Sequence, residues 1–267
     1  MKISLITACY NSAATIRTCF NSVLSQRGVD LEYVVVDGGS TDGTVDIIKD
    51  YSTRSKCSTW FKYISERDQG MYDAINKGIK MATGDAIGIL NADDMFESPE
   101  TLAHIVECFS REEHEEKCSD GDRVDAVYAD IRFVKDDLQT TRRYYSAKRW
   151  KPWMLQWGKM PPHPSVYIRR ELFDKLGLYK LGYDIAADYE LLIRYLRKAG
   201  IKTRYLNECV VKMRMGGKST RGWKSFITLN NEIVRGNREN GYFCCFPMLL
   251  PKYLFKIFEF ILPRLGF

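Results

Sequence analysis

The sequence predicts an α/β fold with a mostly parallel sheet flanked by helices. Through about residue 110, short apolar runs typical of buried strands alternate with amphipathic patterns typical of helices, and the joints between them are short. Such joints favour right-handed crossovers, which make successive strands parallel. Each apolar run also ends in polar residues, and parallel strands bring their carboxyl ends to one edge of the sheet. We therefore expect a ligand site along that edge.

The individual elements follow from local residue patterns. Runs rich in β-branched and aromatic residues predict strands at Lys2–Cys9, Leu31–Asp37, Trp60–Ser65, Ala86–Leu90, Ala126–Phe133 and Thr140–Tyr145. Helical periodicity predicts helices at Thr15–Ser25, Thr44–Tyr51, Met71–Met81 and Thr101–Arg111. Asp42 and its neighbours are turn and capping residues at the start of the second helix. The stretch from Glu112 to Asp122 is acidic and lacks apolar anchors, which is typical of a solvated connection.

Length and composition indicate one compact domain with an appendage. The chain has 267 residues, of which 45% are hydrophobic and 13% aromatic, as is ordinary for a globular protein. Its eight cysteines include no CxxC pair and no zinc-like spacing, so we expect reduced thiols in a cytoplasmic protein. The apolar run from Ile3 to Ala8 is too short for the core of a signal peptide.

The net charge of +6 is unevenly distributed along the chain. The segment from Arg111 to Asp125 is rich in acidic residues, whereas the last third is basic. The basic residues form no helix-turn-helix, zinc-finger or RNA-binding signature, so we expect no nucleic-acid partner. Basic residues beside apolar ones fit a surface of anionic lipid better.

The carboxyl-terminal tail has an amphipathic pattern from Phe243 onward. One helical face carries Leu254, Ile257, Phe258 and Ile261, and another carries Lys252, Lys256 and Glu259. Charged residues interrupt the pattern too often for a transmembrane span, so the tail either lies in the membrane interface or docks on the protein's own core. We favour the interface, with residues 243–267 holding the protein on the inner face of the cell membrane.

Two adjacent carboxylates follow the fourth predicted strand, in the run from Asn91 to Asp94. Carboxylates at the mouth of a parallel sheet suit Mg²⁺ or Mn²⁺, and a phosphate-bearing substrate is the natural third party. The alternative is that Asp93 and Asp94 only open a loop and cap the next helix.

Two other aspartates occupy comparable positions. Asp37 ends a buried strand and enters the glycine-rich turn that leads to Gly43, which is neither a Walker loop nor a GxGxxG motif. A carboxylate there fits a contact with a base or a ribose. Asp68 could accept the imide N–H of a uracil, and Lys77 or Arg67 could bind phosphate oxygens.

Three later segments each permit two interpretations. The tryptophans between Trp150 and Trp157 could face a sugar ring or could pack in the core. His163 lies between two prolines and could contact a diphosphate or an acceptor, or could only pack. Residues 216–220 form a donor-rich loop that could fold over a diphosphate, with Lys218 and Arg214 as phosphate partners.

Taken together, the motifs resemble the family-2 glycosyltransferases, inverting enzymes of the GT-A fold, and within them the bacterial surface-polysaccharide branch. The resemblance also rests on Pro162–Ser165, Ala186–Arg194 and Gly216–Ser219, and it spans residues 2 to about 220. It implies a single GT-A domain at residues 1–222, with a nucleotide-sugar half at 1–110 and an acceptor half at 111–222. Residues 223–267 would then form a helical, membrane-proximal tail.

The resemblance also implies roles for particular residues. Asp37 and Asp68 would hold the uridine of the donor, in a pocket also formed by Thr7, Ala8, Tyr10, Lys77, Asn91 and Ala92. Asp93, with Asp94, would bind the divalent ion on the diphosphate. Asn91 stands where the fuller form of this motif has a carboxylate. Asp188 would be the catalytic base, although Ala187 stands where such enzymes often have a glutamate.

The chemistry of sugar transfer accounts for these roles. Charge builds on the departing diphosphate, where Mg²⁺ or Mn²⁺ acts as a Lewis acid, and one carboxylate removes the proton of the acceptor hydroxyl. We expect a hexosyl or N-acetylhexosaminyl group to move from a UDP-sugar to a saccharide, lipid-linked in surface-polysaccharide synthesis. Two alternatives are a catalytically silent nucleotide-sugar-binding or scaffold protein and a sugar-phosphate nucleotidyltransferase. The second needs a glycine-rich basic loop after the first strand, and Cys9 to Ser12 offers none.

Overall fold

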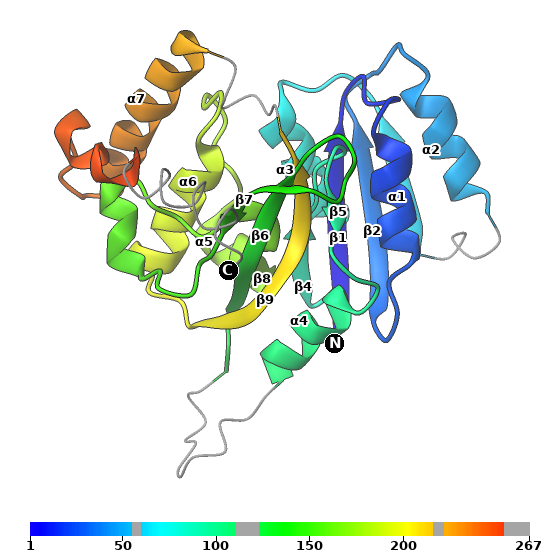
Figure 1. Cartoon of the computed structure of the whole chain (residues 1–267), viewed down its shortest axis with the longest axis horizontal. Coiled ribbons are helices and arrows are strands. Elements are labelled where there is room, and N and C mark those ends of the chain that lie inside the picture. The colour runs from blue at the N-terminus through cyan, green and yellow to red at the C-terminus, as the bar shows by residue number, and fades with distance from the viewer. Residues whose placement is uncertain (55–59, 111–122, 216–221, 254–267) are drawn as a thin grey trace.

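The computed structural model describes residues 1–54, 60–110, 123–215 and 222–253. In this part of the chain one nine-stranded sheet has the order β3-β2-β1-β4-β8-β6-β9-β5, and β7 pairs with β6 (Figure 1). The strands are β1 (Lys2–Cys9), β2 (Asp30–Asp37), β3 (Phe61–Ser65), β4 (Ala86–Ile89), β5 (Met95–Phe96), β6 (Ala126–Val134), β7 (Thr141–Tyr145), β8 (Tyr167–Arg169) and β9 (Thr203–Arg214).

The helices lie on both faces of this sheet. The α-helices are α1 (Ile16–Leu24), α2 (Thr44–Ser52), α3 (Met71–Met81), α4 (Thr101–Ser110), α5 (Glu171–Leu176), α6 (Ala187–Leu192) and α7 (Trp223–Glu239). Helix α6 continues into a π-helical turn, η3 (Ile193–Lys198), and short 3₁₀ turns occur at η1 (Pro152–Trp157), η2 (His163–Ser165) and η5 (Phe246–Leu249).

Most of the strands run in one direction. β1, β2, β3 and β4 pair only in parallel with one another, and β6 pairs in parallel with β9. β8 is antiparallel to both β4 and β6, so β4, β6 and β9 share the direction of β1, while β5, β7 and β8 oppose it. This confirms the predicted α/β class. Strand β1 and helix α3 match their predicted bounds to the residue, whereas β5, β8 and β9 were not predicted.

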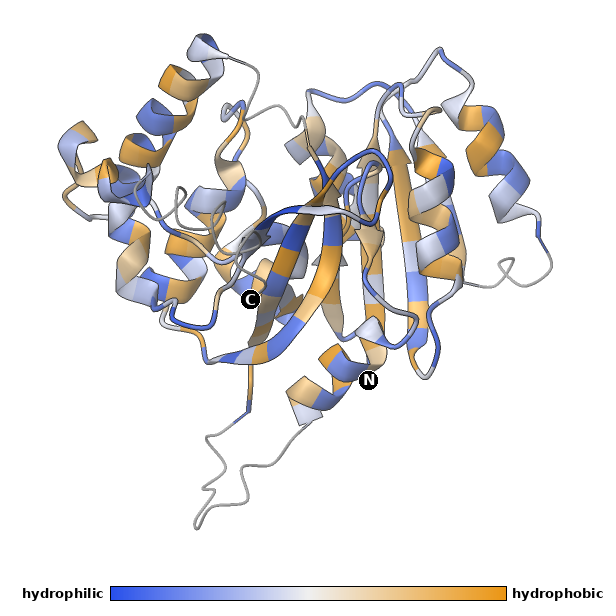
Figure 2. Ribbon diagram, in the orientation of Figure 1, coloured by the Kyte–Doolittle hydropathy of each residue, from blue (hydrophilic) through white to orange (hydrophobic). Residues whose placement is uncertain are grey.

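The sheet is buried on both faces because apolar side chains alternate between two cores. Ile3 and Leu5 pack in one core, with helices α1, α2 and α4. Ile6 and Val34 pack in the other, with α3 and α6. Figure 2 shows hydrophobic colour along the central strands and striped helices around them. Continuous apolar runs are what doubly covered parallel strands require.

The parallel strands bring their carboxyl ends to one edge. In the register of the sheet, Cys9 is the partner of Asp37, and Asp37 is the partner of Ser65. The amide of Leu90, just after β4, donates to the carbonyl of Ile6 on β1. The polar segments that follow β1, β2, β3 and β4 therefore start side by side, as predicted.

Helix α7 packs on α6 through a polar inner face. Its buried residues are Asn230, Glu232, Ile233, Gly236 and Asn237. Across the described ranges, no helix combines the length and the apolar character needed to cross a bilayer. Residues 254–267, which carry most of the predicted amphipathic face, lie outside the described residues, and the boundary at residues 222/223 stays a prediction.

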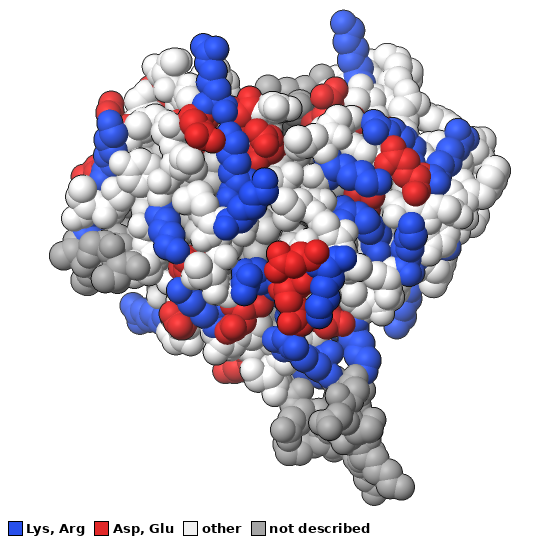
Figure 3. Space-filling model, turned by 180° about the vertical axis from the view of Figure 1, so that it is seen from behind, with Lys and Arg blue, Asp and Glu red and all other residues white. Residues whose placement is uncertain are grey.

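The rear face of the molecule carries both signs of charge. In Figure 3, lysine and arginine side chains lie interspersed with aspartate and glutamate side chains. Ion pairs such as Arg123–Glu171, at 3.2 Å, are exposed and contribute little to stability.

Glu32 is a buried carboxylate near the start of β2, at the end of the parallel strands opposite to the predicted site. Glu32, with its side chain 1% exposed, accepts hydrogen bonds from Lys62 Nζ at 2.5 Å and from the Thr83 amide at 2.7 Å, and also from Ser4 Oγ. Burial raises the pKa of Glu32, but the bonds from Lys62, Ser4 and Thr83 outweigh burial and lower this pKa to about 2. A carboxylate whose folded pKa is depressed stabilises the folded state above its unfolded pKa.

We therefore expect Glu32→Gln to lower the free energy of unfolding at pH 7 by about 2 kcal/mol, as for a charged hydrogen bond. The difference from wild type should shrink as the pH falls from about 4.3, the ordinary glutamate value, toward the folded value. Urea unfolding at pH 7 and at acid pH measures it. The exposed Glu171→Gln serves as control, and an equal loss in both variants, or a loss independent of pH, would contradict the assignment.

Candidate active site

Asp37 organises the turn at the end of β2. Its carboxylate is fully buried and accepts hydrogen bonds from the amides of Gly39 at 3.1 Å and Ser40 at 3.0 Å. It also accepts from the hydroxyl of Ser65 at 2.7 Å, which ties the end of β2 to the end of β3. The buried negative charge is thus held by backbone and hydroxyl donors, and the turn that follows it is fixed in place.

Asp68 lies against the same turn. A Cβ atom on Gly38 would stand 2.4 Å from Oδ2 of Asp68, so the missing side chain is what allows this approach. The other carboxylate oxygen of Asp68 accepts a hydrogen bond from the amide of Gly70 at 2.8 Å. The structure therefore brings together Asp37 and Asp68, which are far apart in the sequence.

The end of β1 forms the neighbouring part of this edge. Tyr10 is 62% exposed and Ala8 is partly buried. Thr7 is fully buried, and its hydroxyl donates to the carbonyl of Leu90 at 2.8 Å and accepts from the hydroxyl of Tyr33 at 2.9 Å. Of the three predicted pocket residues at the end of β1, Tyr10, which directly follows the strand, offers the most surface to a ligand, while Thr7 joins β1 to the segment after β4.

The segment after β4 presents its two aspartates differently. Asp93 is exposed, whereas Asp94 is 1% exposed. Ala92, which precedes Asp93, is buried, and Asn91 is partly buried. Asn91 donates its side-chain amide to Oδ2 of Asp94 at 2.8 Å. Oδ1 of Asp94 has no hydrogen-bond partner of normal geometry among the described residues. Asn91, which stands in place of a carboxylate, thus holds one oxygen of Asp94 and leaves the other unused.

The surroundings of Asp94 are those of a carboxylate that could bind a cation. Burial raises its pKa well above the ordinary value, and the neighbouring charge of Asp93 raises it further. The amide of Asn91 and then Arg214 lower this pKa, but by less. An unused buried oxygen next to a second, exposed carboxylate fits the oxygen donor set of Mg²⁺ or Mn²⁺. In the described residues no group of three or more His, Cys, Asp and Glu could hold a metal, so ligand oxygens would have to complete the shell.

Asp188 lies in the first turn of α6 and is partly exposed. Its Oδ1 accepts hydrogen bonds from its neighbour's amide, Tyr189 N, at 2.8 Å and from the hydroxyl of Tyr72 at 3.4 Å. Burial raises the pKa of Asp188, while His163, the Tyr189 amide and Tyr72 lower it by less, so the net shift is upward. Because Tyr72 belongs to α3, this carboxylate is linked directly to the half of the fold that carries Asp37 and Asp68.

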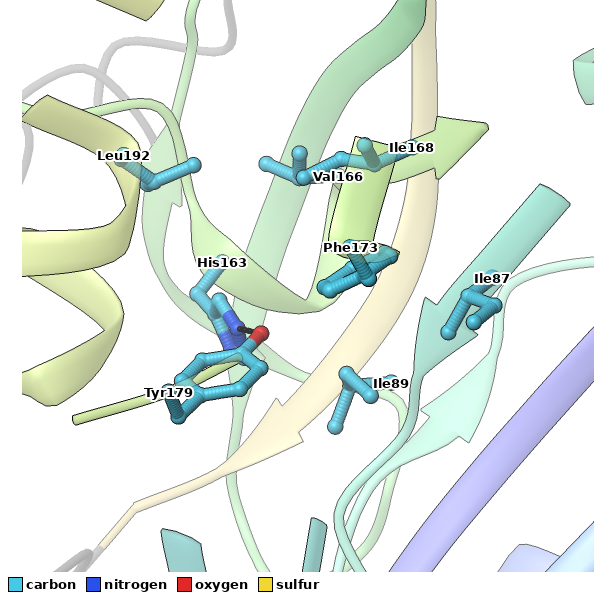
Figure 4. A pocket seen from close by; sticks show the side chains of 8 residues that line it. All are labelled: Ile87, Ile89, His163, Val166, Ile168, Phe173, Tyr179 and Leu192. Atoms are coloured by element: carbon cyan, nitrogen blue, oxygen red, sulfur yellow. Dashed lines mark hydrogen bonds between the residues drawn. The ribbon is translucent and has the colours of Figure 1, made fainter. Parts of the chain in front are cut away.

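His163 is hydrogen-bonded to the side chain of Tyr179. Its Nε2 lies 2.7 Å from the hydroxyl of Tyr179. Figure 4 draws this hydrogen bond as a dashed line. Burial lowers the pKa of His163 and the charge of Asp188 raises it by less, so the ring is neutral at pH 7. The two rings border an enclosed cavity of about 10 Å³, otherwise lined by apolar side chains such as Ile89 and Phe173. This space suits a single water molecule, not a substrate.

The residues predicted to bind phosphate differ in the contacts that they make in the structure. Lys77 Nζ lies 2.8 Å from Glu66 and donates to the carbonyl of Arg67 at 3.0 Å, so its charge is paired in this structure. Arg214 ends β9 beside Asp94 and donates to the hydroxyl of Thr18 at 3.4 Å, while its Nε has no partner among the described residues. Lys218 lies outside the described residues.

The three tryptophans divide between the two interpretations. Trp150 is 2% exposed and donates its Nε1–H to the carbonyl of Lys159 at 3.0 Å, as a core residue does. Trp153 and Trp157 are 56% and 40% exposed. Of the three tryptophans in this segment, only Trp153 and Trp157 are exposed enough to contact a ligand.

The structure adds functional residues that the sequence did not indicate. Tyr72 donates to the carbonyl of Ile185 at 2.5 Å as well as to Asp188. Tyr179 stacks on Tyr72 with ring centroids 5.8 Å apart and binds His163. Both tyrosines connect elements more than 100 residues apart in the chain, so no local pattern could have shown their role.

The fold and the acidic edge define an α/β protein that binds ligands at the carboxyl ends of its strands. The chain belongs to glycosyl transferase family 2, whose model matches residues 4–177, more than half of its length. Asp188 lies beyond that match. The predicted family is therefore confirmed, and the protein is a glycosyltransferase of glycan synthesis.

Curated relatives extend the match further along the chain. A PGL/p-HBAD biosynthesis glycosyltransferase of Mycobacterium tuberculosis is 32% identical over 233 residues, which are 86% of this chain and 80% of the relative. An uncharacterized glycosyltransferase of a Nostoc species is 32% identical over 186 residues, covering 66% of this chain and 53% of the relative.

Solved structures of the same fold are longer than this chain. The mannosyltransferase PcManGT from Pyrobaculum calidifontis, in complex with GDP-Man and Mn²⁺, has a TM-score of 0.63 at 21% identity and covers 89% of this chain and 63% of its own. S. aureus TarS 1–349 in complex with UDP-GlcNAc has a TM-score of 0.62 at 20% identity and covers 88% of this chain and 66% of its own. These similarities confirm the fold of the GT-A type.

The position of Asn91 yields a test of the cation site. In Asn91→Asp the amide that binds Asp94 is lost and a third carboxylate joins the pair. In EDTA the free energy of unfolding should therefore fall by about 1–3 kcal/mol, and the melting temperature should fall with it. Mn²⁺ with UDP should then raise the melting temperature of the variant more than that of wild type. Calorimetry with and without Mn²⁺ measures both. Asn231→Asp, exposed on α7, is the control, and equal Mn²⁺ shifts in all three proteins would count against a cation at Asp93 and Asp94.

Proposed function

We propose that the protein is an inverting glycosyltransferase that moves a sugar from a UDP-linked donor to a saccharide acceptor, with Asp188 as general base. One observation carries the proposal. Asp188, a partly exposed carboxylate with a raised pKa, is hydrogen-bonded to the helix that follows the donor-side aspartates. A general base works best when its pKa is shifted toward the working pH, and Asp188 is shifted in that direction.

The donor would bind at the edge formed by the ends of β1, β2 and β3. Asp68, placed against the glycine turn, would accept the imide N–H of uracil, and exposed Tyr10 would cover the base. Asp37 would act through the turn, since its oxygens already bind Gly39, Ser40 and Ser65. Among the similar structures, TarS binds UDP-GlcNAc and PcManGT binds GDP-Man, which supports a nucleotide-sugar donor. A hexosyl or N-acetylhexosaminyl group is the proposed cargo.

Asp93 and Asp94 would hold Mg²⁺ or Mn²⁺. A bound ion would supply Lewis-acid stabilisation of the departing diphosphate. Asn91 would keep Asp94 in place, because its amide already holds Oδ2 and leaves Oδ1 available. Arg214, whose Nε has no partner among the described residues, would add positive charge beside these carboxylates.

The transfer itself is a single displacement. Asp188 takes the proton of the acceptor hydroxyl while the oxygen of that hydroxyl forms a bond to the anomeric carbon. The bond from this carbon to the diphosphate breaks at the same time, which releases UDP and inverts the carbon. The hydroxyl of Tyr72 and the amide of Tyr189 both donate to Oδ1 of Asp188. Oδ2 is then the oxygen left to accept the proton. Neutral His163 would line the acceptor side without adding a permanent charge.

Asp188→Asn keeps the shape of the side chain but removes the base. We expect kcat for sugar transfer to fall about 10²- to 10⁴-fold, the range for loss of a general base, with donor affinity within about twofold of wild type. In wild type, kcat should rise with pH through the raised pKa of Asp188, because only the carboxylate form accepts the proton. Mass-spectrometric transfer assays with Mn²⁺ and donor titrations measure both quantities.

Asp174→Asn, on the exposed face of α5, is the matched control. Transfer by Asp188→Asn at the wild-type rate would exclude this base. Absence of any product from the wild type with a panel of nucleotide sugars, together with tight donor binding, would favour the silent binding protein instead. Formation of a nucleotide sugar from a sugar phosphate and a nucleoside triphosphate would favour the nucleotidyltransferase.

We also propose that the acceptor is lipid-linked and that the protein lies on the inner face of the cell membrane. Exposed aromatic residues gather where α7 begins and around η5, with Trp223 74% and Phe243 71% exposed. Trp223 stacks on Phe226 with centroids 5.2 Å apart, and Phe226 contacts the rings of Phe246 and Tyr253. We call these five residues the aromatic face. Exposed aromatic rings near lysines suit a lipid interface.

Replacing two rings of the aromatic face, in Trp223→Ser with Phe243→Ser, should weaken binding to vesicles that contain phosphatidylglycerol by about tenfold or more, as expected for lost apolar burial. Donor hydrolysis without vesicles should be unchanged, since neither ring lies at the sheet edge. Co-sedimentation with vesicles measures the binding. Tyr63→Ser, an exposed tyrosine on β3, is the control, and equal binding by the double variant and this control would refute membrane docking through this face.

A further inference from the structure

Glu232 of α7 binds the backbone that leads into the proposed catalytic helix. Its side chain is buried, with the residue 9% exposed. Oε1 accepts a hydrogen bond from the amide of Asp184 at 2.6 Å, and Oε2 accepts from the amides of Ile185 at 2.9 Å and Ala186 at 2.8 Å. These three successive amides end two residues before Asp188.

This carboxylate fixes the backbone just before α6, at the N-cap residue and the two residues that precede it. Helix α6 has Ala186 at its N-cap position and no side-chain capping bond of its own. The first amides of a helix need acceptors, and a negative charge is favoured there. Glu232, from a different helix, supplies a negative charge and an acceptor for the N-cap amide of Ala186, and it also binds the two amides before it. Bonds between a carboxylate and backbone amides are among the stronger hydrogen bonds in proteins.

The same segment is held from its other side by α3. The hydroxyl of Tyr72 donates to the carbonyl of Ile185 and to Oδ1 of Asp188. The peptide groups of residues 184–186 therefore have their N–H groups fixed by α7 and one carbonyl fixed by α3. The direction in which Asp188 leaves the backbone depends on both contacts.

We propose that Glu232 is a positioning residue that sets the orientation of the Asp188 carboxylate toward the acceptor hydroxyl. The inference rests on the proposed function of Asp188 as base. Loss of the Glu232 carboxylate leaves the buried amide of Ala186 and the part-buried amides of Asp184 and Ile185 without this acceptor, so the segment moves to find others. A misplacement of about 1 Å in a reacting group can cost about 10²-fold in rate.

A second glutamate on α7 provides a close comparison. Glu239 Oε2 binds Lys180 Nζ at 2.9 Å and the hydroxyl of Tyr183 at 3.0 Å, and its Oε1 binds Arg235 Nε at 2.6 Å. It therefore joins α7 to the same loop, but none of these partners lies in residues 184–188. Removing either charge weakens the packing of α7, and only the Glu232 change should disturb Asp188.

The test compares Glu232→Gln with Glu239→Gln, each in the wild-type and the Asp188→Asn backgrounds. At saturating acceptor, Glu232→Gln should lower kcat about 10- to 100-fold, with KM for the donor within about twofold, while Glu239→Gln stays within about twofold in both. In the Asp188→Asn background, Glu232→Gln should change the residual kcat by less than about twofold, because a residue that acts only through the base has no effect once the base is gone.

Each outcome separates the alternatives. An equal loss in the two backgrounds would show a general structural role and overturn the inference, as would an unchanged kcat for Glu232→Gln when Asp188→Asn is impaired. Full activity of Asp188→Asn would instead overturn the proposed function. Donor-binding stoichiometry reports the folded fraction. If Glu232→Gln does not fold, Glu232→Asp, which keeps the charge but shortens its reach, is measured in the same cycle with the same expectations.

Discussion

The position of Asp188 relative to the donor-side aspartates depends on helix α3, because this helix contacts both halves of the fold. It follows the Asp68 segment directly, and it packs on β1 and β2. From its opposite side, buried Asn76 donates to the carbonyl of Tyr179 at 2.8 Å and accepts from the amide of Tyr179 at 3.0 Å. Such a paired contact fixes both the distance and the direction of the bound backbone. With Tyr72 one turn earlier, α3 places the segment that carries Asp188 against the carboxyl edge of the sheet.

Three aspartates of this edge differ in what their surroundings offer a negative charge. Asp37 is buried but surrounded by amide and hydroxyl donors, so its charge is already stabilised and its role is to shape the turn. Asp94 is buried with one oxygen unpartnered among the described residues and a second carboxylate beside it, so a bound cation would stabilise its charge. Asp188 is only partly satisfied, and its raised pKa suits proton transfer. Environment, not residue type, separates the structural carboxylate from the proposed metal ligand and the proposed base.

The sequence predicted those parts of the structure that local patterns encode. The parallel strands β1 to β4 and helix α3 were found because each is an uninterrupted apolar or amphipathic run, and the four site segments followed from where those runs end. β8 has only three residues and β5 two, too few for periodicity to show. β9 was missed although it is long, because its burial is mostly partial and its alternation is weak. Tyr72 and Glu232 could not be found, since their partners lie 113 and 46–48 residues away.

Helix α7 shows why the carboxyl-terminal part resisted prediction and how it relates to the rest. Its inner face buries Asn230, Glu232 and Asn237, so a search for apolar periodicity finds no core-facing stripe there. Its exposed aromatic residue, Trp223, lies instead in its first turn, where it stacks on Phe226. Helix α7 thus carries two residues of the aromatic face, Trp223 and Phe226, together with the Glu232 carboxylate that binds the Asp188 segment. If that face docks on a membrane, the distance from the lipid surface to the base is fixed by the length of α7, and an acceptor saccharide attached to lipid is presented at a constant height above the bilayer.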